Sequence, residues 1–119
     1  MEMPKIFESE YRFCQILWEK EPIGSGELAE LCFQRLGWKK STTYTVIKRL
    51  TERGVIRSEK AVVTSVVSRE QIQEAESQEV VARSFSDSLP QFVAAFTRSR
   101  KLRPEEAEEI RRLIEEYHE

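Results

Sequence analysis

"GWKKSTTYTVIKRLTERG", residues 37–54, is the stretch that decides the fold. Its apolar side chains, among them Val46 and Leu50, recur at helical spacing and form one narrow stripe. Most of the other residues carry hydroxyl or cationic groups, and Gly54 follows where glycine commonly ends a helix. The segment therefore predicts a short amphipathic helix that begins near Lys39 to Ser41.

The flanking segments predict two further helices and a hairpin. Residues 8–21 have apolar side chains at helical spacing, and a second helix opens at Gly24 or Ser25 and ends at Gly37. "VIRSEKAVVTSVV", residues 55–67, is rich in β-branched residues around a short polar break, which predicts a two-stranded hairpin. Helix, helix, helix and hairpin is the order of a winged helix-turn-helix, whose third helix enters the DNA major groove.

Charge is distributed unevenly along the 119 residues. The net charge is −2, but residues 34–60 carry eight Lys or Arg against two Glu, which gives +6. Residues 1–33 and residues 61–119 each sum to −4. A basic segment within an acidic chain is typical of a nucleic-acid binder. The alternative is that these cations only keep one helix face in water.

The polar side of the third predicted helix carries groups that suit a DNA groove. Threonine offers a hydroxyl for base edges or phosphates and a methyl for thymine, and Lys and Arg neutralise phosphates or read guanine. Backbone N–H groups at the start of such a helix also suit phosphate. The candidate DNA contacts from this pattern are Thr42, Thr43, Tyr44, Thr45, Lys48 and Arg49. A winged helix that binds another protein remains the alternative.

The second half of the chain predicts three more helices. Ser68 and Gln71 have the spacing of a capping box and open a helix that runs to about Phe85. "SDSLP", residues 86–90, then breaks the pattern and starts the next helix, and Pro104 opens the last one.

These three helices are apolar on one side only, and about 50 residues rarely bury such faces within one chain. We therefore expect a symmetric homodimer with a total interface of at least about 1,600 Å². The candidate interface residues are Ile72, Val81, Phe85, Leu89, Phe92, Val93, Phe96, Ile110, Leu113, Ile114 and Tyr117. The alternative is a monomer in which the phenylalanines pack on the first helix.

The predicted fold class is mainly α, with a winged helix-turn-helix of three helices and a short two-stranded hairpin, followed by a helical dimerisation region. Residues 1–67 form the predicted DNA-binding domain, and residues 68–119 form the dimerisation region.

Four stretches carry a resemblance to a known family. "EYRFCQILWEK", "GELAELC", "WKKSTTYTVIKRLTERGVI" and "VVSREQ" resemble, in order and spacing, the penicillinase repressor (BlaI/MecI/CopY) family of bacterial winged-helix regulators. The most specific part comprises Trp38, Thr42, Thr45, Ile47, Arg49, Leu50 and Gly54. The resemblance implies a homodimeric repressor on a palindromic operator, with the winged helix on double-stranded DNA and the C-terminal helices forming the dimer.

The resemblance also implies roles for single residues. By this match, the best candidates for DNA contacts are Lys40, Ser41, Thr42, Thr45 and Arg49. Trp38 matches a supporting or backbone contact, with packing between helices as the alternative.

Two departures from the family pattern bear on DNA contact. Lys39 and Lys40 stand where such repressors often have Ser-Pro, so the helix start is uncertain by one or two residues. In the hairpin, Arg57 and Lys60 are the only cations, and the second strand has no aromatic residue. We expect Arg57 and Lys60 to make weaker DNA contacts than the family norm.

Relief of repression is a further implication of the resemblance. In the penicillinase branch of the family, it implies cleavage at an Asn-Phe bond in the dimerisation helices, which makes a membrane sensor protease a possible partner. The matching bond here joins Ala95 to Phe96, so the phenylalanine is kept and the asparagine is not. The copper-responsive branch uses a cysteine-rich tail, and no cysteine follows Cys32.

Other function classes find little support in the sequence. There is no nucleophile with a base, no phosphate-binding glycine loop, no cofactor motif and no cluster of metal ligands, so we expect neither an enzyme nor a metalloprotein. We expect Cys14 and Cys32 to be small buried hydrophobes. No run has the length of a membrane helix and no signal peptide is evident, so we expect a cytoplasmic protein without membrane insertion.

Overall fold

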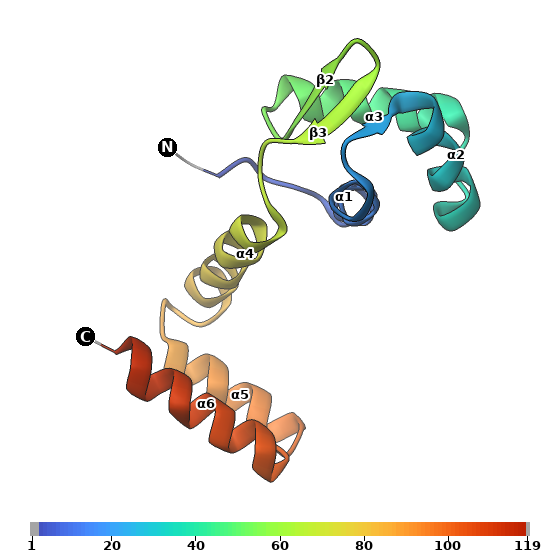
Figure 1. Cartoon of the computed structure of the whole chain (residues 1–119). Coiled ribbons are helices and arrows are strands. Elements are labelled where there is room, and N and C mark those ends of the chain that lie inside the picture. The colour runs from blue at the N-terminus through green and yellow to red at the C-terminus, as the bar shows by residue number, and fades with distance from the viewer. Residues whose placement is uncertain (1–2, 119) are drawn as a thin grey trace. The chain divides into compact units, whose positions relative to one another are not determined.

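The computed structural model describes residues 3–118. Within them the chain is mainly helical, as predicted, with six helices and a small sheet (Figure 1). The elements are α1 (Glu8–Lys20), β1 (Ile23–Gly24), α2 (Ser25–Leu36), α3 (Lys40–Glu52), β2 (Ile56–Glu59), β3 (Val62–Ser65), α4 (Arg69–Ser84), α5 (Leu89–Ser99) and α6 (Pro104–Tyr117). The chain divides into two compact units, the first ending at Glu76 and the second beginning at Ser77.

The first unit has one core, to which helices and sheet both contribute. Phe13 and Leu17 of α1, Leu28 of α2, Leu50 of α3 and Val63 of β3 have no exposed surface. Burial of a side chain of this size stabilises the fold by about 1.5–3 kcal/mol. Because this shared core fixes α3 from behind, the polar side of α3 faces outward. The predicted order of three helices and a hairpin is confirmed.

The sheet has three strands, in the order β1-β3-β2. β2 and β3 form the predicted hairpin, here called the wing, with Lys60 and Ala61 at positive φ in its turn. Positive φ at both central residues is the geometry of a type I′ hairpin turn. The prediction of two strands was incomplete, because Ile23 and Gly24 add a third strand antiparallel to β3. A strand this short leaves no periodicity in the sequence.

Glycine sets the two boundaries that place α3. Gly37 follows α2 with φ 72°, and its N–H donates to the Phe33 carbonyl oxygen at 3.1 Å. Gly54 follows α3 with φ 78°. Glycine adopts this left-handed conformation without the steric cost that a Cβ atom adds, so both ends of the segment are fixed locally. α3 begins at Lys40, within the predicted range.

The start of α4 belongs to the first unit. Ser68 and Gln71 form the predicted capping box, since each side chain accepts a hydrogen bond from the other's backbone N–H, at 3.1 and 2.9 Å. The Trp18 Nε1–H donates to the carbonyl oxygen of Val67 at 3.0 Å. Ile72 is only 2% exposed, so its assignment to the dimer interface was wrong: its side chain is already buried within the chain.

In the second unit, both predicted helix starts are confirmed. The Ser88 Oγ accepts a hydrogen bond from the Gln91 N–H at 3.2 Å at the start of α5, and Pro104 is the first residue of α6. Phe92 lies between Phe85 and Phe96, with ring centroids 5.4 and 6.4 Å away. No residue of α5 or α6 is buried in the single chain.

Candidate nucleic-acid interface

The outward side of α3 is polar and accessible. Ser41, Thr42, Thr45 and Lys48 are exposed, and Tyr44 at the edge of this side is also exposed. Since the opposite side of α3 is held in the core, the backbone positions that carry these side chains keep a fixed arrangement on one helix surface. They are predicted DNA contacts that the structure brings together.

Thr43 does not belong to this surface. It is 0% exposed and lies on the same stripe as Val46, Ile47 and Leu50, at i, i+3, i+4 and i+7. Its prediction as a DNA contact was therefore wrong, because helical periodicity overrides its polar character. The hydroxyl lies beside the Cys32 thiol and has no nitrogen or oxygen partner within the described part of the chain.

The hydroxyl groups on the exposed side are partly committed to the helix. The Thr45 Oγ1–H donates to the Ser41 carbonyl oxygen at 3.0 Å. This bond uses the proton of Thr45 and holds its rotamer, while the oxygen lone pairs and the methyl group stay accessible. Thr45 is thus suited to accept a hydrogen bond from a base or to touch a thymine methyl.

The four lysines of the basic segment and Arg57 of the wing fall into two groups. Lys40 Nζ lies 3.2 Å from a carboxylate oxygen of Glu30, and Arg57 Nε lies 4.0 Å from one of Glu59. These ion pairs are exposed and weak, so a DNA phosphate can take the place of the carboxylate in each.

The second group has no carboxylate partner among residues 3–118. It consists of Lys39 before α3, Lys48 in its middle and Lys60 in the wing turn. Their charge is available to a polyanion without prior loss of an ion pair. The contacts of Arg57 and Lys60 with DNA stay predictions.

Trp38 is a packing residue on at least one face. Its ring stacks on Phe13 with centroids 6.2 Å apart and an interplanar angle of 3°, and it packs against the core. The packing alternative is therefore confirmed, and a DNA contact of its remaining surface stays a prediction.

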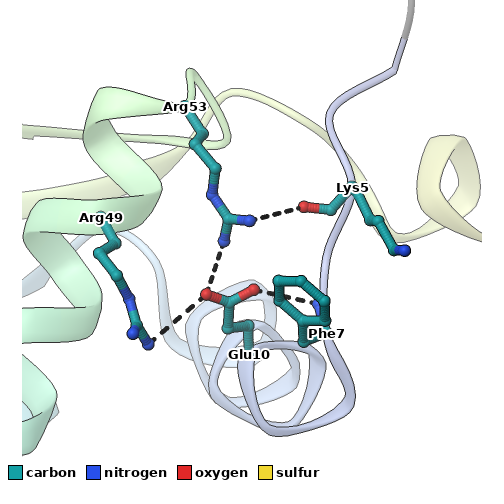
Figure 2. Close-up of polar contacts among 5 residues, drawn as sticks. All are labelled: Lys5, Phe7, Glu10, Arg49 and Arg53. Carbon is teal, nitrogen blue, oxygen red and sulfur yellow. Dashed lines mark hydrogen bonds and ion pairs between the residues drawn. The ribbon is translucent and has the colours of Figure 1, made fainter.

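A buried carboxylate on α1 holds one flank of α3 (Figure 2). Glu10 is 3% exposed, and its Oε2 lies 2.6 Å from Arg53 Nη2 and 3.6 Å from Arg49 Nη2. Its Oε1 accepts a hydrogen bond from the Phe7 N–H at 3.0 Å. Arg53 also donates from Nη1 to the Lys5 carbonyl oxygen at 3.0 Å, which ties the segment before α1 to α3.

The charge state of Glu10 follows from these partners. Burial alone would raise the pKa of its carboxyl, but the hydrogen bonds from Arg53 and the Phe7 amide, with the charges of Arg53 and Arg49, hold the pKa below its ordinary value. Glu10 is therefore ionised near neutral pH. This cluster was not predicted from the sequence, because a glutamate in a first helical turn is usually solvated. The available signal was the i, i+4 spacing of Arg49 and Arg53, which places both on one flank.

The predicted dimer residues of α5 and α6 are accessible. Exposed fractions are 59% for Leu89, 43% for Val93, 41% for Phe96, 39% for Ile110, 51% for Leu113, 62% for Ile114 and 79% for Tyr117. Val81, Phe85 and Phe92 are half-buried, and the two phenylalanines already contact each other. The Ala95–Phe96 bond lies inside α5.

Two further findings concern the residues that the structure describes. Residues 3–118 contain no group of three or more His, Cys, Asp or Glu side chains placed to hold a metal ion. In the same range, none of the helices combines the length and the apolar character needed to cross a membrane.

Comparison with known families gives a match over nearly the whole chain. The model of the penicillinase repressor family matches residues 6–116, which include all of α1 to α5 and most of α6. Comparison with curated proteins gives no match. Members of the matching family are transcriptional regulators and not enzymes. The chain therefore belongs to the penicillinase repressor family.

Proposed function

We propose that the chain is a sequence-specific transcriptional repressor that binds a palindromic operator as a homodimer. In this proposal residues 1–67 are the DNA-binding domain and residues 68–119 the dimerisation region. The observation that carries it is the exposed polar side of α3, where Ser41, Thr45 and Lys48 lie opposite a stripe held in the core.

Recognition follows from the size and chemistry of α3. The major groove admits one helix, and the side chains on its outward face reach base edges. Ser41, Thr42 and Thr45 are short, so they let the helix approach closely. Lys39, Lys40, Lys48 and Arg49 contact phosphates or guanine at the borders of the groove. Arg57 and Lys60 of the wing contribute further backbone contacts.

Dimerisation follows from α5 and α6. Seven large apolar side chains of these helices are more than a third exposed in the single chain. A second copy that covers them doubles the winged helix and matches a palindrome by its twofold symmetry. Tyr117 of α6 and Phe96 of α5, which are 79% and 41% exposed, are the aromatic residues of these helices most accessible for such an interface.

Repression has to be relieved, and resemblance to the penicillinase branch of the family implies one route, proteolysis by a membrane sensor protease at Ala95–Phe96, although Ala95 replaces the asparagine of that branch. A peptide within α5 must unwind before a protease can hold it in extended form, so cleavage also requires the helix to open. If the chain stays full length with membranes from β-lactam-treated cells, this mode of relief is excluded. Because the ligand is DNA, we place the protein in the bacterial cytoplasm.

Salt dependence of binding separates the proposal from its main alternative, a winged helix that binds protein. For a DNA binder, log K for duplex DNA falls linearly with log salt, with a slope near −0.9 for each neutralised phosphate. We expect about six to ten such contacts for the dimer, and therefore a loss of about 10³- to 10⁵-fold between 50 and 200 mM salt. Fluorescence anisotropy with a random-sequence duplex measures this slope. No binding, or binding without a salt slope, would favour the protein adaptor.

A further inference from the structure

Glu10 is buried although it is charged. It is the only buried acidic side chain in the part of the chain that the structure describes. Burying a carboxylate is costly unless it is paired. A first-turn glutamate that only caps α1 could accept the Phe7 N–H and stay in water. The burial of Glu10 against Arg49 of α3 and Arg53 at the C-cap of α3 indicates a second task.

The two arginines are bound unequally. Arg53 lies 2.6 Å from the carboxylate, is 32% exposed and makes a further hydrogen bond to the Lys5 carbonyl oxygen. Arg49 lies 3.6 Å from the same oxygen and is 56% exposed. Arg53 therefore neutralises Glu10, while Arg49 keeps its positive charge and free N–H donors. Figure 2 shows both guanidinium groups directed at Glu10 from one flank of α3.

The position of Arg49 connects this cluster with the candidate DNA surface. Arg49 lies one helical turn from Thr45 and two turns from Thr42. An arginine beside a helix that lies in the major groove borders the phosphate backbone. A free arginine loses much rotamer freedom when it binds, and one that is already held loses less.

We propose that Glu10 is a positioning residue for DNA binding. It orients Arg49 toward a backbone phosphate, while Arg53 neutralises the charge of Glu10. The inference rests on the proposed function. Glu10 itself does not touch DNA. It acts by limiting where the Arg49 guanidinium lies before the phosphate arrives.

Simple electrostatics predicts the opposite effect. Glu10→Gln removes a negative charge from a DNA-binding unit, and general attraction to the polyanion would then strengthen binding. Positioning predicts weaker binding, by about 3- to 10-fold. Gln suits the test because it can still accept the Phe7 N–H in the capping box. Glu8→Gln is the matched control: Glu8 lies in the same first turn and pairs with Arg12, but is exposed.

The experiment is a mutant cycle on duplex DNA recovered by the unmodified protein from a random-sequence library. Dissociation constants of the full-length chain, Glu10→Gln, Arg49→Ala and the double variant are measured between about 50 and 200 mM salt. Arg49→Ala should reduce the salt slope by about 0.9 for each phosphate that Arg49 neutralises. Glu10→Gln should weaken binding in the unmodified background and have no further effect in the Arg49→Ala background. Glu8→Gln should leave binding equal or stronger.

Two outcomes overturn the inference. Equal or tighter binding by Glu10→Gln shows that Glu10 does not prepare Arg49. Equal weakening in both backgrounds shows that Glu10 acts only through the stability of the fold. If Glu10→Gln does not fold, the Glu10→Asp variant is used in its place, because aspartate keeps the charge but is too short to reach Arg49 in the same way. Glu10→Asp should then weaken DNA binding in the unmodified background and have no further effect in the Arg49→Ala background. If the unmodified protein binds no duplex, the proposed function itself fails; if it binds and the coupling is absent, only the inference fails.

Discussion

Truncation of one exposed leucine tests whether a second copy covers α6. At about 0.8 kcal/mol per buried carbon group, the three carbons removed by Leu113→Ala contribute about 2.4 kcal/mol when fully buried. Leu113 is 51% exposed in the single chain, so about half of this, about 1.2 kcal/mol, is left for a partner to bury. A twofold dimer contains Leu113 twice, so it loses about 2.4 kcal/mol of burial free energy in total. This loss raises the dimer dissociation constant about 60-fold.

Sedimentation equilibrium over a range of protein concentrations measures this constant. Arg112→Ala is the matched control, because it removes a long side chain from the same helix opposite the centre of the apolar stripe of Ile110, Leu113, Ile114 and Tyr117. We expect Arg112→Ala to change the dissociation constant by less than about threefold. Far-UV circular dichroism should show equal helix content in both variants.

Coverage of α6 by a second copy is refuted if Leu113→Ala and Arg112→Ala have the same dimer dissociation constant. It is also refuted if the unmodified chain sediments as a monomer at every concentration. In the first case α6 lies outside the interface, and in the second the exposed apolar side chains bind something other than a second copy.

Three further predictions concern single residues of the first unit. Thr43→Val should keep DNA affinity and retain or raise stability, because the buried hydroxyl of Thr43 has no nitrogen or oxygen partner in the described residues. Thr45→Val, in contrast, should weaken DNA binding. Equal losses of DNA affinity by the two variants, measured by fluorescence anisotropy, would contradict this prediction. Glu10→Gln should be less stable than the unmodified chain at neutral pH. Because the pKa of Glu10 is depressed from 4.5, this difference should vanish as pH falls through the lowered value, and a pH-independent difference in urea unfolding would oppose the assignment. Burial and the Glu10 charge raise the pKa of Cys14 to about 12, and burial also raises the pKa of Cys32. Iodoacetamide at mildly alkaline pH should therefore label both cysteines only after denaturation. Mass spectrometry measures the labelling, and labelling of the native protein would contradict this prediction.

The elements around α3 could be predicted because their signals are local. Gly37 and Gly54 bound the segment by their own backbone preferences, and the Ser68–Gln71 capping box marks a helix start within four residues. The polar side of α3 followed from its periodicity in the same way. Thr43 shows the limit of judging by residue type: the spacing to Val46, Ile47 and Leu50 predicts burial, and its hydroxyl suggests exposure.

Features that depend on distant partners were missed. β1 is a strand only because Ile23 and Gly24 pair with Val63 and Val62, far along the chain. Glu10 is buried because Arg53, more than forty residues later, reaches it from another helix. The pairing of β1 leaves no mark in the local sequence, and the spacing of Arg49 and Arg53 places two cations on one flank without identifying Glu10 as their partner.

Sequence selection tests the central claim most directly. The purified protein and a Thr45→Ala/Arg49→Ala double variant are each offered a random library of duplex DNA at the same salt concentration, and the recovered sequences are read. We predict that the unmodified protein enriches one palindrome and that the double variant does not. Enrichment of no sequence by either protein, or of the same palindrome by both, would contradict the account in which α3 reads an operator.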